Sequence, residues 1–252
     1  MQINRILFEI FEDRARKIKI ERMCLGLGYS AITTSDGGTG IAYTWLDNKD
    51  ACMVQKGYEN PEGKPAIGVL EHIMSDTPVE RTMALALVNA LNYQAAMDLA
   101  ADSDNTDLLD LLNVKQDTRV AMVGAFKPLI RMINQRKGIV ELLDMGRQIG
   151  DPARFYTFLE QWPDAVVVTS TSILNNTTED ILHRVKNDIP VVMLGPSTPL
   201  VKAPFAELGV NYLAGTVPVD IDGTYRAIRH GTGTPVIQKF GQKVLLPVNE
   251  GG

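Results

Sequence analysis

The spacing of hydrophobic positions changes along the first half of the chain from helical to alternating. Apolar residues recur at helical spacing over 4–16, among charged residues, which predicts an amphipathic helix. Over 18–33 the period becomes two, and after the 36–38 turn the segment 41–45 supplies a returning strand. This pattern predicts an antiparallel meander that follows the opening helix.

A long helix is expected next, after a Gly-, Pro- and Asn-rich loop over 49–65. Pro78 opens it, and the segment 83–99 is apolar nearly all round, with Asn89 and Asn92 as the polar exceptions. Two amides three residues apart lie on one helix face. We favour the interpretation that they hold nearby backbone groups, with ligand contact as the alternative.

The second half of the chain alternates short apolar runs with helical segments. The stretch 119–145 is typical of strand, helix and second strand, with Pro128 in the first helical turn and Gly138 at the helix end. Further strands are predicted over 165–169, 189–194 and 210–214, helices over 178–185 and 222–229, and a strand pair around Phe240 and Gly241. We therefore predict an α/β fold whose C-terminal part is a doubly wound, mostly parallel sheet.

A polar segment over 102–107 separates the two patterns. It predicts an N-terminal α+β domain over 1–117 and a C-terminal α/β domain over 118–252.

Gly26 and Gly28 belong to a stretch that formally matches the glycine-rich dinucleotide fingerprint. That fingerprint requires a helix N-terminus directly after the glycines. Here residues 32–34 continue as a strand and turn. We interpret the glycines as a bend in a crowded sheet.

Composition narrows the class of function. The 252-residue chain is 45% hydrophobic and 22% charged, with a formal charge of -5 and no Lys/Arg stripe, which argues against nucleic-acid binding. Its apolar runs are too short to span a membrane and no signal-peptide core precedes them, so we expect a cytoplasmic protein. Cys24 and Cys52 match neither a zinc nor a redox spacing, and both are expected to be reduced and structural.

Small polar residues gather at three predicted strand ends. In a parallel sheet such loops meet at one edge, where hydroxyls, amides and helix N-termini can bind an anion or a polar ring. The alternative is that these residues only cap helices and form turns. The candidate ligand-binding residues are Gly124, Phe126, Thr169, Thr171, Asn175, Thr177, Gly195, Ser197 and Thr198, with Asn89 and the Ser35, Asp36 and Gly37 turn facing them from the N-terminal domain.

Acidic residues form a second group of candidates. Glu141 and Asp144 end the predicted second strand, where a ribose-binding acid lies in Rossmann folds. Asp220 and Asp222 could bind a hard cation, or could equally be turn and N-cap residues. The histidines are scattered, and no zinc-protease motif, P-loop or nucleophile elbow occurs.

Five segments together resemble a bacterial and archaeal family described as "putative heavy-metal chelation" proteins. They are GLGYSAITTSDGGTGIAYT from Gly26, LALVNALN from Leu85, VAMVGAF from Val120, VVVTSTSILNNTTEDIL from Val166 and VMLGPSTPL from Val192. The resemblance covers almost the whole chain. It implies an enolase N-terminal-like domain and a Rossmann-like C-terminal domain with a cleft between them.

The expected function is binding of a small polar ligand, anionic or metal-chelating, in that cleft. Zinc and copper favour thiolate and imidazole ligands, which the sequence does not cluster, so we expect a divalent metal with oxygen ligands or a metal already held by a small chelator. The alternative is an enzyme that uses a nucleotide or nucleotide-derived cofactor at the sheet edge. Whether a reaction is catalysed, and whether the protein forms a homo-oligomer, stays open at this point.

Overall fold

The computed structural model describes residues 1–46, 59–102 and 106–248. Cys52 and much of the predicted 49–65 loop lie outside these ranges, as does part of the 102–107 segment. Two sheets organise the fold: a three-stranded antiparallel sheet in the order β1-β2-β3, and a six-stranded sheet in the order β5-β4-β6-β7-β8-β9. The predicted combination of an antiparallel meander and a mostly parallel α/β sheet is confirmed.

The elements follow one another along the chain in two groups. The first group is α1 (Gln2–Lys17), β1 (Ile20–Leu25), β2 (Tyr29–Thr34), β3 (Thr39–Tyr43), α2 (Ile67–Leu70), the 3-10 turn η1 (Glu71–Met74), α3 (Pro78–Leu91) and α4 (Tyr93–Met97). The second group is α5 (Thr106–Leu111), β4 (Arg119–Val123), α6 (Lys127–Gln135), β5 (Ile139–Leu143), η2 (Met145–Arg147), α7 (Pro152–Gln161), β6 (Ala165–Thr169), η3 (Ser170–Ile173), α8 (Thr178–Leu182), β7 (Val191–Leu194), α9 (Ala203–Ala206), β8 (Tyr212–Pro218), α10 (Ile221–Arg229), α11 (Thr234–Ile237), η4 (Gln238–Phe240) and β9 (Gly241–Pro247).

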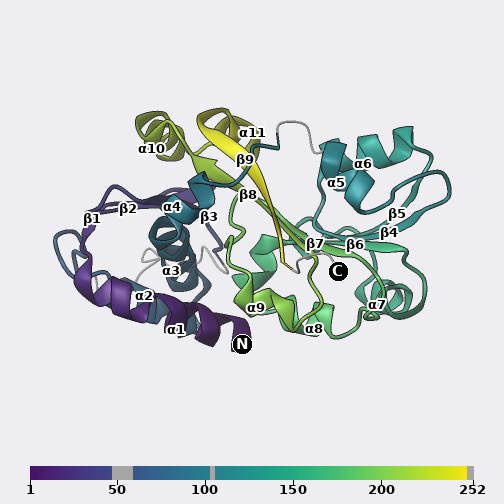
Figure 1. The fold of residues 1–252 in the computed structure, drawn as a ribbon, viewed down its shortest axis with the longest axis horizontal. Helices are drawn as coiled ribbons and strands as arrows, with labels where there is room; N and C mark the ends of the chain where they lie inside the picture. Colours follow the sequence, from purple (N-terminus) through teal and green to yellow (C-terminus); the bar gives the residue numbers. More distant parts are fainter. Residues whose placement is uncertain (47–58, 103–105, 249–252) are drawn as a thin grey trace.

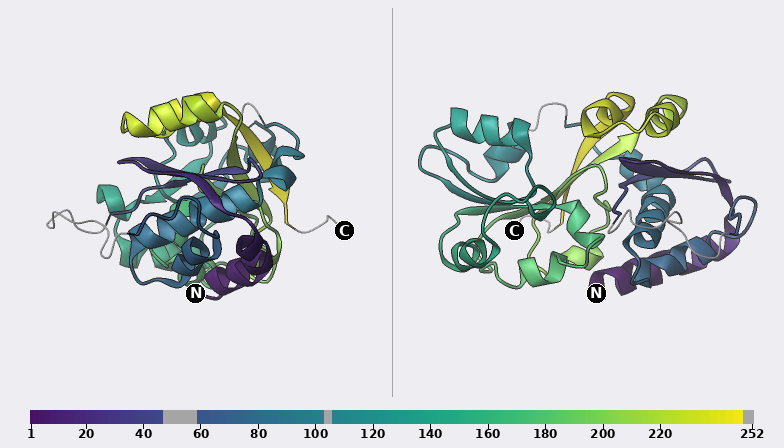
Figure 2. Two further views of the ribbon diagram at one scale, coloured as in Figure 1. Left: turned by 90° about the vertical axis from the view of Figure 1, so that its left-hand side faces the viewer. Right: turned by 180° about the vertical axis from the view of Figure 1, so that it is seen from behind.

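The three-stranded sheet lies between helices from both ends of the chain. Its lower face in Figure 1 packs on α3, which is buried almost all round, as its apolar sequence predicts. Its upper face is covered by α10 and α11, seen again above the sheet in both views of Figure 2. A separate apolar cluster fills that layer: Tyr29, Ala31 and Ile41 of the sheet contact Tyr225 and Ile228 of α10.

Close backbone approach explains the glycines of this sheet. A Cβ on Gly40 would lie 2.2 Å from the Ala86 carbonyl oxygen of α3, and one on Gly28 would lie 2.5 Å from the Thr232 carbonyl oxygen. Gly26 and Gly28 belong to the bend between β1 and β2, and no helix follows them. The rejection of the dinucleotide fingerprint is therefore confirmed.

The six-stranded sheet has helices on both faces, with α5 and α6 on one and α7, α8 and α9 on the other (Figure 1). Its central strands β4, β6 and β7 are apolar and buried, as expected for parallel strands covered on both sides. The strand pair predicted around Phe240 and Gly241 is wrong. A single strand, β9, begins at Gly241 and pairs antiparallel with β8 at the sheet edge.

Helix α7, like α5 and α11, was not predicted from the sequence. Asp151 caps it by accepting a hydrogen bond from the Arg154 N–H, and Pro152 occupies its first turn. Phe155 and Leu159, four residues apart, are its buried positions. These cap and spacing signals are present in the sequence.

The two sheets share one hydrophobic core, and polar contacts cross between them. The Arg81 guanidinium, buried at 3% exposure on α3, donates to the Leu174 carbonyl oxygen at 2.8 and 2.5 Å. Asn92 at the end of α3 donates to the Leu200 carbonyl oxygen at 2.8 Å. The division at residue 117 stays a prediction, since α10 and α11 pack on the N-terminal sheet. In the described ranges, no helix combines the length and the apolarity that crossing a membrane requires.

An ion pair at the start of β4 makes the stability of the fold depend slightly on pH in the acid range. Arg119 donates to Asp164 through its backbone N–H at 2.8 Å and its guanidinium at 2.6 Å. The guanidinium hydrogen bond is the main cause that lowers the pKa of Asp164. A lowered carboxyl pKa stabilises the fold above the unfolded value of about 4, and this stabilisation is lost as pH falls through the lowered value.

We therefore expect Asp164→Asn to cost less than about 1 kcal/mol at neutral pH, because solvent screens an ion pair this exposed. The difference between wild type and variant should shrink below about pH 4. Urea unfolding at pH 7 and pH 3 measures both. A difference that is the same at the two pH values would contradict the assignment.

Candidate functional site

The strand order of the large sheet reverses at β4, which lies between β5 and β6. In open α/β sheets the loops on either side of such a reversal are the usual place for a ligand. Gly124 directly follows β4, and Thr169 ends β6. Gly124 has φ +93°, and a Cβ on it would lie 2.8 Å from the Thr169 Cβ. The glycine therefore lets the two loops lie in contact, and Phe126 follows as the N-cap of α6.

The acid beside these loops is Asp144. Its carboxylate accepts from the Ala125 N–H at 3.0 Å, the Arg147 N–H at 3.0 Å and the Arg147 guanidinium at 2.9 Å. The Ala125 bond joins the loop after β4 to the loop after β5, and the two Arg147 bonds hold Asp144 within its own loop. Glu141, predicted at the same strand end, lies within the edge strand β5, opposite Ala121.

Hydroxyl groups of the loop after β6 bond mostly to one another. Thr169 and Thr171 share a hydrogen bond of 2.9 Å, and Thr177 donates to the Asn175 side-chain oxygen at 2.7 Å. Ser172 is buried and bonds to Thr178 at 2.7 Å. Most polar groups here therefore have partners within the loop, as turn and cap residues do.

Ser170 differs from its neighbours. Its Oγ is buried and has no hydrogen-bond partner in the described structure. It lies against Gly195 of the loop after β7, where an added Cβ would be 2.6 Å from the hydroxyl oxygen. Burying a hydroxyl without a hydrogen-bond partner costs free energy. Ser170 is therefore the position at this sheet edge where a polar atom of a ligand could bind. Sequence patterning did not single it out, because Ser170 resembles the adjacent cap residues.

The loop after β7 contacts the N-terminal sheet directly. The Ser197 hydroxyl accepts from the Tyr43 N–H at 2.7 Å, and Asn89 donates to the Ile41 and Ser197 carbonyl oxygens at 2.9 and 3.3 Å. Thr198 is buried and donates to the Gly195 carbonyl oxygen at 2.8 Å. The structure thus brings Asn89, Ser197 and Thr198 together, and Asn89 and Asn92 hold backbone groups, as we favoured from the sequence.

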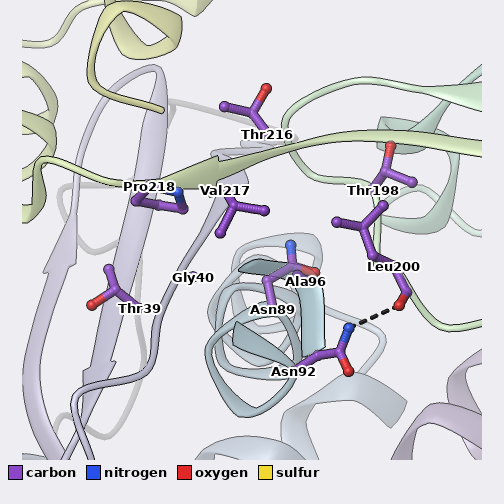
Figure 3. A pocket seen from close by; sticks show the side chains of 10 residues that line it. All are labelled: Thr39, Gly40, Asn89, Asn92, Ala96, Thr198, Leu200, Thr216, Val217 and Pro218. Atoms are coloured by element: carbon purple, nitrogen blue, oxygen red, sulfur yellow. Dashed lines mark hydrogen bonds between the residues drawn. The ribbon is translucent and has the colours of Figure 1, made fainter. Parts of the chain in front are cut away.

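A small cavity lies between the two sheets at this contact. Figure 3 shows Asn89 and Asn92 on α3 beside Leu200 and the end of β8, with Thr39 and Gly40 across from them. Its volume is about 10 Å³, which is room for roughly one water molecule. A larger ligand at this contact would therefore require the loops to move apart.

The Ser35, Asp36 and Gly37 turn is held by its own part of the chain. Asp36 accepts from Arg14 of α1 and from Thr34, both at 2.7 Å, and Ser35 accepts from the Lys19 N–H. Burial acts to raise the pKa of Asp36, but the Thr34 and Arg14 hydrogen bonds outweigh it and lower that pKa overall. In the described structure this turn forms no hydrogen bond with the loops that follow β4, β6 and β7, which we call the strand-end loops.

Candidate metal ligands do not converge. Asp220 caps α10 by accepting from the Gly223 N–H at 2.8 Å, whereas Asp222 is exposed and pairs with Arg22 at 3.5 Å. The described residues contain no group of three or more His, Cys, Asp or Glu side chains that could hold a metal ion. Cys24 is a free thiol in β1.

Removing the Ser197 hydroxyl should affect the contact between the sheets. We expect Ser197→Ala to cost about 1–3 kcal/mol of stability, because the Tyr43 N–H loses its partner at a partly buried contact, on which the Ser197 side is fully buried. Chemical denaturation measures this loss. An unchanged stability would indicate that another group accepts the hydrogen bond.

Comparisons with known proteins agree with this architecture. Residues 107–247 match the DUF364 family model and residues 8–92 match the DUF4213 model, both described as "putative heavy-metal chelation". An uncharacterised protein of Methanocaldococcus jannaschii is 22% identical, with 98% of this chain and 97% of that protein covered.

Two crystal structures of DUF364 proteins with unknown function share the fold. The one from Desulfitobacterium hafniense has a TM-score of 0.76 and 21% identity, covering 96% of this chain and 99% of that chain. The one from Pyrococcus horikoshii has a TM-score of 0.77 and 21% identity, covering 98% of each chain. The resemblance inferred from the sequence motifs is confirmed, and the chain belongs to the DUF364 family of "putative heavy-metal chelation" proteins.

Proposed function

We propose that this protein binds a small polar ligand, an anion or a metal chelate, at the strand-end loops that face the N-terminal sheet. The observation that carries the proposal is the Ser170 hydroxyl, buried and without a partner between the loops after β6 and β7. Buried polar groups in native proteins nearly always have partners. A polar atom of a ligand, reaching this edge, would supply the missing one.

Contacts of the loops with helix α3 support a ligand that is enclosed when bound. The loop after β6 is held by Arg81 and the loop after β7 by Asn89 and Asn92. Small shifts of α3 would therefore change both loops together. The cavity beside Asn89 and Asn92 holds roughly one water and is not lined by Ser170, so a ligand that reaches the Ser170 hydroxyl would require such a shift.

The chemistry of these loops favours a metal that arrives already chelated. Thr169, Ser170 and Thr171 offer neutral hydroxyls, which are poor ligands for zinc or copper but good partners for the carboxylate oxygens of a chelator. The absence of a metal-ligand cluster from the described residues agrees with this. The family description points the same way, toward a metal-related role.

A thermal-shift screen followed by calorimetry tests the proposal. Ni²⁺, Co²⁺, Cu²⁺ and Zn²⁺ would each be added alone and as the citrate and histidine complexes, with citrate and histidine alone as controls. We expect a complex or a free anion to stabilise the protein, by about 2.7 kcal/mol at 100 times its dissociation constant. Stabilisation by the bare metal ions equal to that by their complexes would contradict the proposal.

Ser170→Ala locates the site, with Ser172→Ala as the matched control. Ser170→Ala removes a hydroxyl that lacks a partner, so it should leave stability unchanged or raise it by up to about 1 kcal/mol while weakening ligand binding at least about fivefold. Ser172→Ala removes a bonded hydroxyl of the same loop and should cost about 1 kcal/mol of stability with little effect on affinity. If the two variants bind the ligand with equal affinity, the Ser170 hydroxyl does not contact the ligand.

A nucleotide-dependent enzyme is the second candidate. The reversal of strand order at β4 favours it, since dinucleotides and flavins bind at such points. Adding NAD, NADP, FMN and ATP to the same screen distinguishes the two proposed functions. Stabilisation by a nucleotide and not by a chelate would support the nucleotide-dependent enzyme.

A further inference from the structure

A second hollow lies on the N-terminal sheet, away from the strand-end loops. It has a volume of about 350 Å³ and is open to solvent, within the size range of small-molecule sites. Three parts of the chain form it: the end of β1 with the bend after it, the segment after β3, and the end of α10. The lining residues are Cys24, Leu25, Gly26, Leu27, Thr44, Leu46, Ile228, Arg229 and Gly231.

The walls of this hollow are mostly apolar. Leu25 and Leu27, two positions apart, are exposed at 37% and 74% and place apolar surface at the hollow. Gly26 between them packs closely on α10, since an added Cβ would lie 2.6 Å from the Ile228 side chain. This close contact joins the bend after β1 to the end of α10 at the hollow.

One positive charge lies at its rim. Arg229 lines the hollow, is exposed, and forms no ion pair within the described part of the chain. Arg22, the other guanidinium close to Cys24, is already engaged, since it pairs with Asp222 at 3.5 Å and lies 3.6 Å from the centre of the Tyr225 ring. Burial raises the pKa of the Cys24 thiol more than the two arginines lower it, so the thiol is neutral near pH 7 and does not compete for Arg229.

We infer that this hollow is a binding site for a small amphipathic acid, with its apolar body against Leu25, Leu27 and Ile228 and its anionic group on Arg229. The positive charge of Arg229, which has no ion pair within the described ranges, complements an anionic group, and the apolar walls disfavour an inorganic anion as the ligand. None of its lining residues belongs to the strand-end loops, so the two sites can be tested separately.

Octanoate is a suitable probe, with octan-1-ol as its uncharged counterpart. Calorimetry should show saturable octanoate binding to the full chain, at least about fivefold tighter than that of octan-1-ol, because only the carboxylate can form charge-assisted hydrogen bonds with Arg229. Arg229→Gln should weaken octanoate binding about five- to tenfold and leave octanol binding unchanged. The matched control is Arg226→Gln, which removes the same charge from an exposed position of α10 that does not line the hollow.

Cys24 provides a second readout at the site itself. Bound octanoate should slow the alkylation of Cys24 by iodoacetamide, followed by mass spectrometry of the Cys24 peptide, at least about threefold at saturation. Protection that Arg229→Gln weakens and Arg226→Gln preserves would support the assignment.

Several results would overturn the inference. These are an absence of saturable octanoate binding, equal effects of Arg229→Gln and Arg226→Gln, or equal affinity for octanol and octanoate. Concentration-dependent dimerisation that Leu27→Asp abolishes would identify a second copy of the chain as the occupant. Sedimentation with phosphatidylglycerol vesicles, without octanoate binding, would identify a membrane surface.

Discussion

Replacing Gly40 with alanine is expected to destabilise the protein by about 3 kcal/mol or more. The added Cβ would lie 2.2 Å from both the Ala86 carbonyl oxygen and the Ala90 nitrogen of α3. Backbone atoms of a buried helix cannot rotate away as a side chain can. The sheet would have to lift from α3, and the apolar contacts along the whole helix would loosen.

Gly68→Ala is the matched control for this change. Gly68 lies in α2, and an added Cβ would meet nothing within 4 Å. Alanine at a helical position should be neutral or stabilising by up to about 1 kcal/mol. Urea denaturation of both variants measures the contrast, and similar stabilities for the two would show that α3 and β3 do not pack this closely in solution.

Arg81→Met is expected to have the second large effect, a loss of about 3 kcal/mol. The Arg81 guanidinium donates to the Leu174 carbonyl oxygen and, at 2.5 Å, to the Ser75 carbonyl oxygen. Methionine fills much of the same space but donates no hydrogen bond. The Leu174 carbonyl group would therefore lose a charged donor in a buried place, and the Ser75 carbonyl group would lose one in a partly buried place.

Arg131→Met controls for the chemical change itself, because Arg131 lies at an exposed position of α6. Its stability should stay within about 0.5 kcal/mol of wild type. Amide hydrogen exchange adds a second measurement: in Arg81→Met the loop that contains Leu174 should exchange faster than in wild type. If exchange there is unchanged while stability falls, the loss arises elsewhere.

Much of the fold could be predicted because its signals are local. The strands 165–169 and 119–123 are short β-branched or apolar runs, and the cap and turn residues around α6 mark its ends. The first strand of the 119–145 stretch ends at Val123, because Gly124 leaves the extended conformation with φ +93°. The end of this strand is set by the φ angle of one residue, and the pattern of apolar residues carries no information on that angle.

The partners of the polar residues could not be predicted in the same way. Ser170 and Ser197 both follow parallel strands and differ little in sequence context, yet one hydroxyl lacks a partner and the other accepts from Tyr43. Arg81 was missed as well, although a cation in a helix apolar on nearly every side was a usable signal. A hydroxyl or guanidinium is equally suited to several partners, so its role depends on which backbone groups the fold brings near.

The cover that α10 and α11 provide for the three-stranded sheet has a consequence for synthesis on the ribosome. Thr33 of β2 and Tyr225 of α10, whose hydroxyls bond at 3.0 Å, are 192 positions apart. At about 5–20 residues per second, roughly ten to forty seconds separate their appearance. During that interval the apolar face of Tyr29, Ala31 and Ile41 has none of its final neighbours from α10. The nascent chain therefore exposes an apolar surface that chaperones can bind. Slowing translation before residue 221 should lengthen this exposure and increase aggregation of the newly made protein.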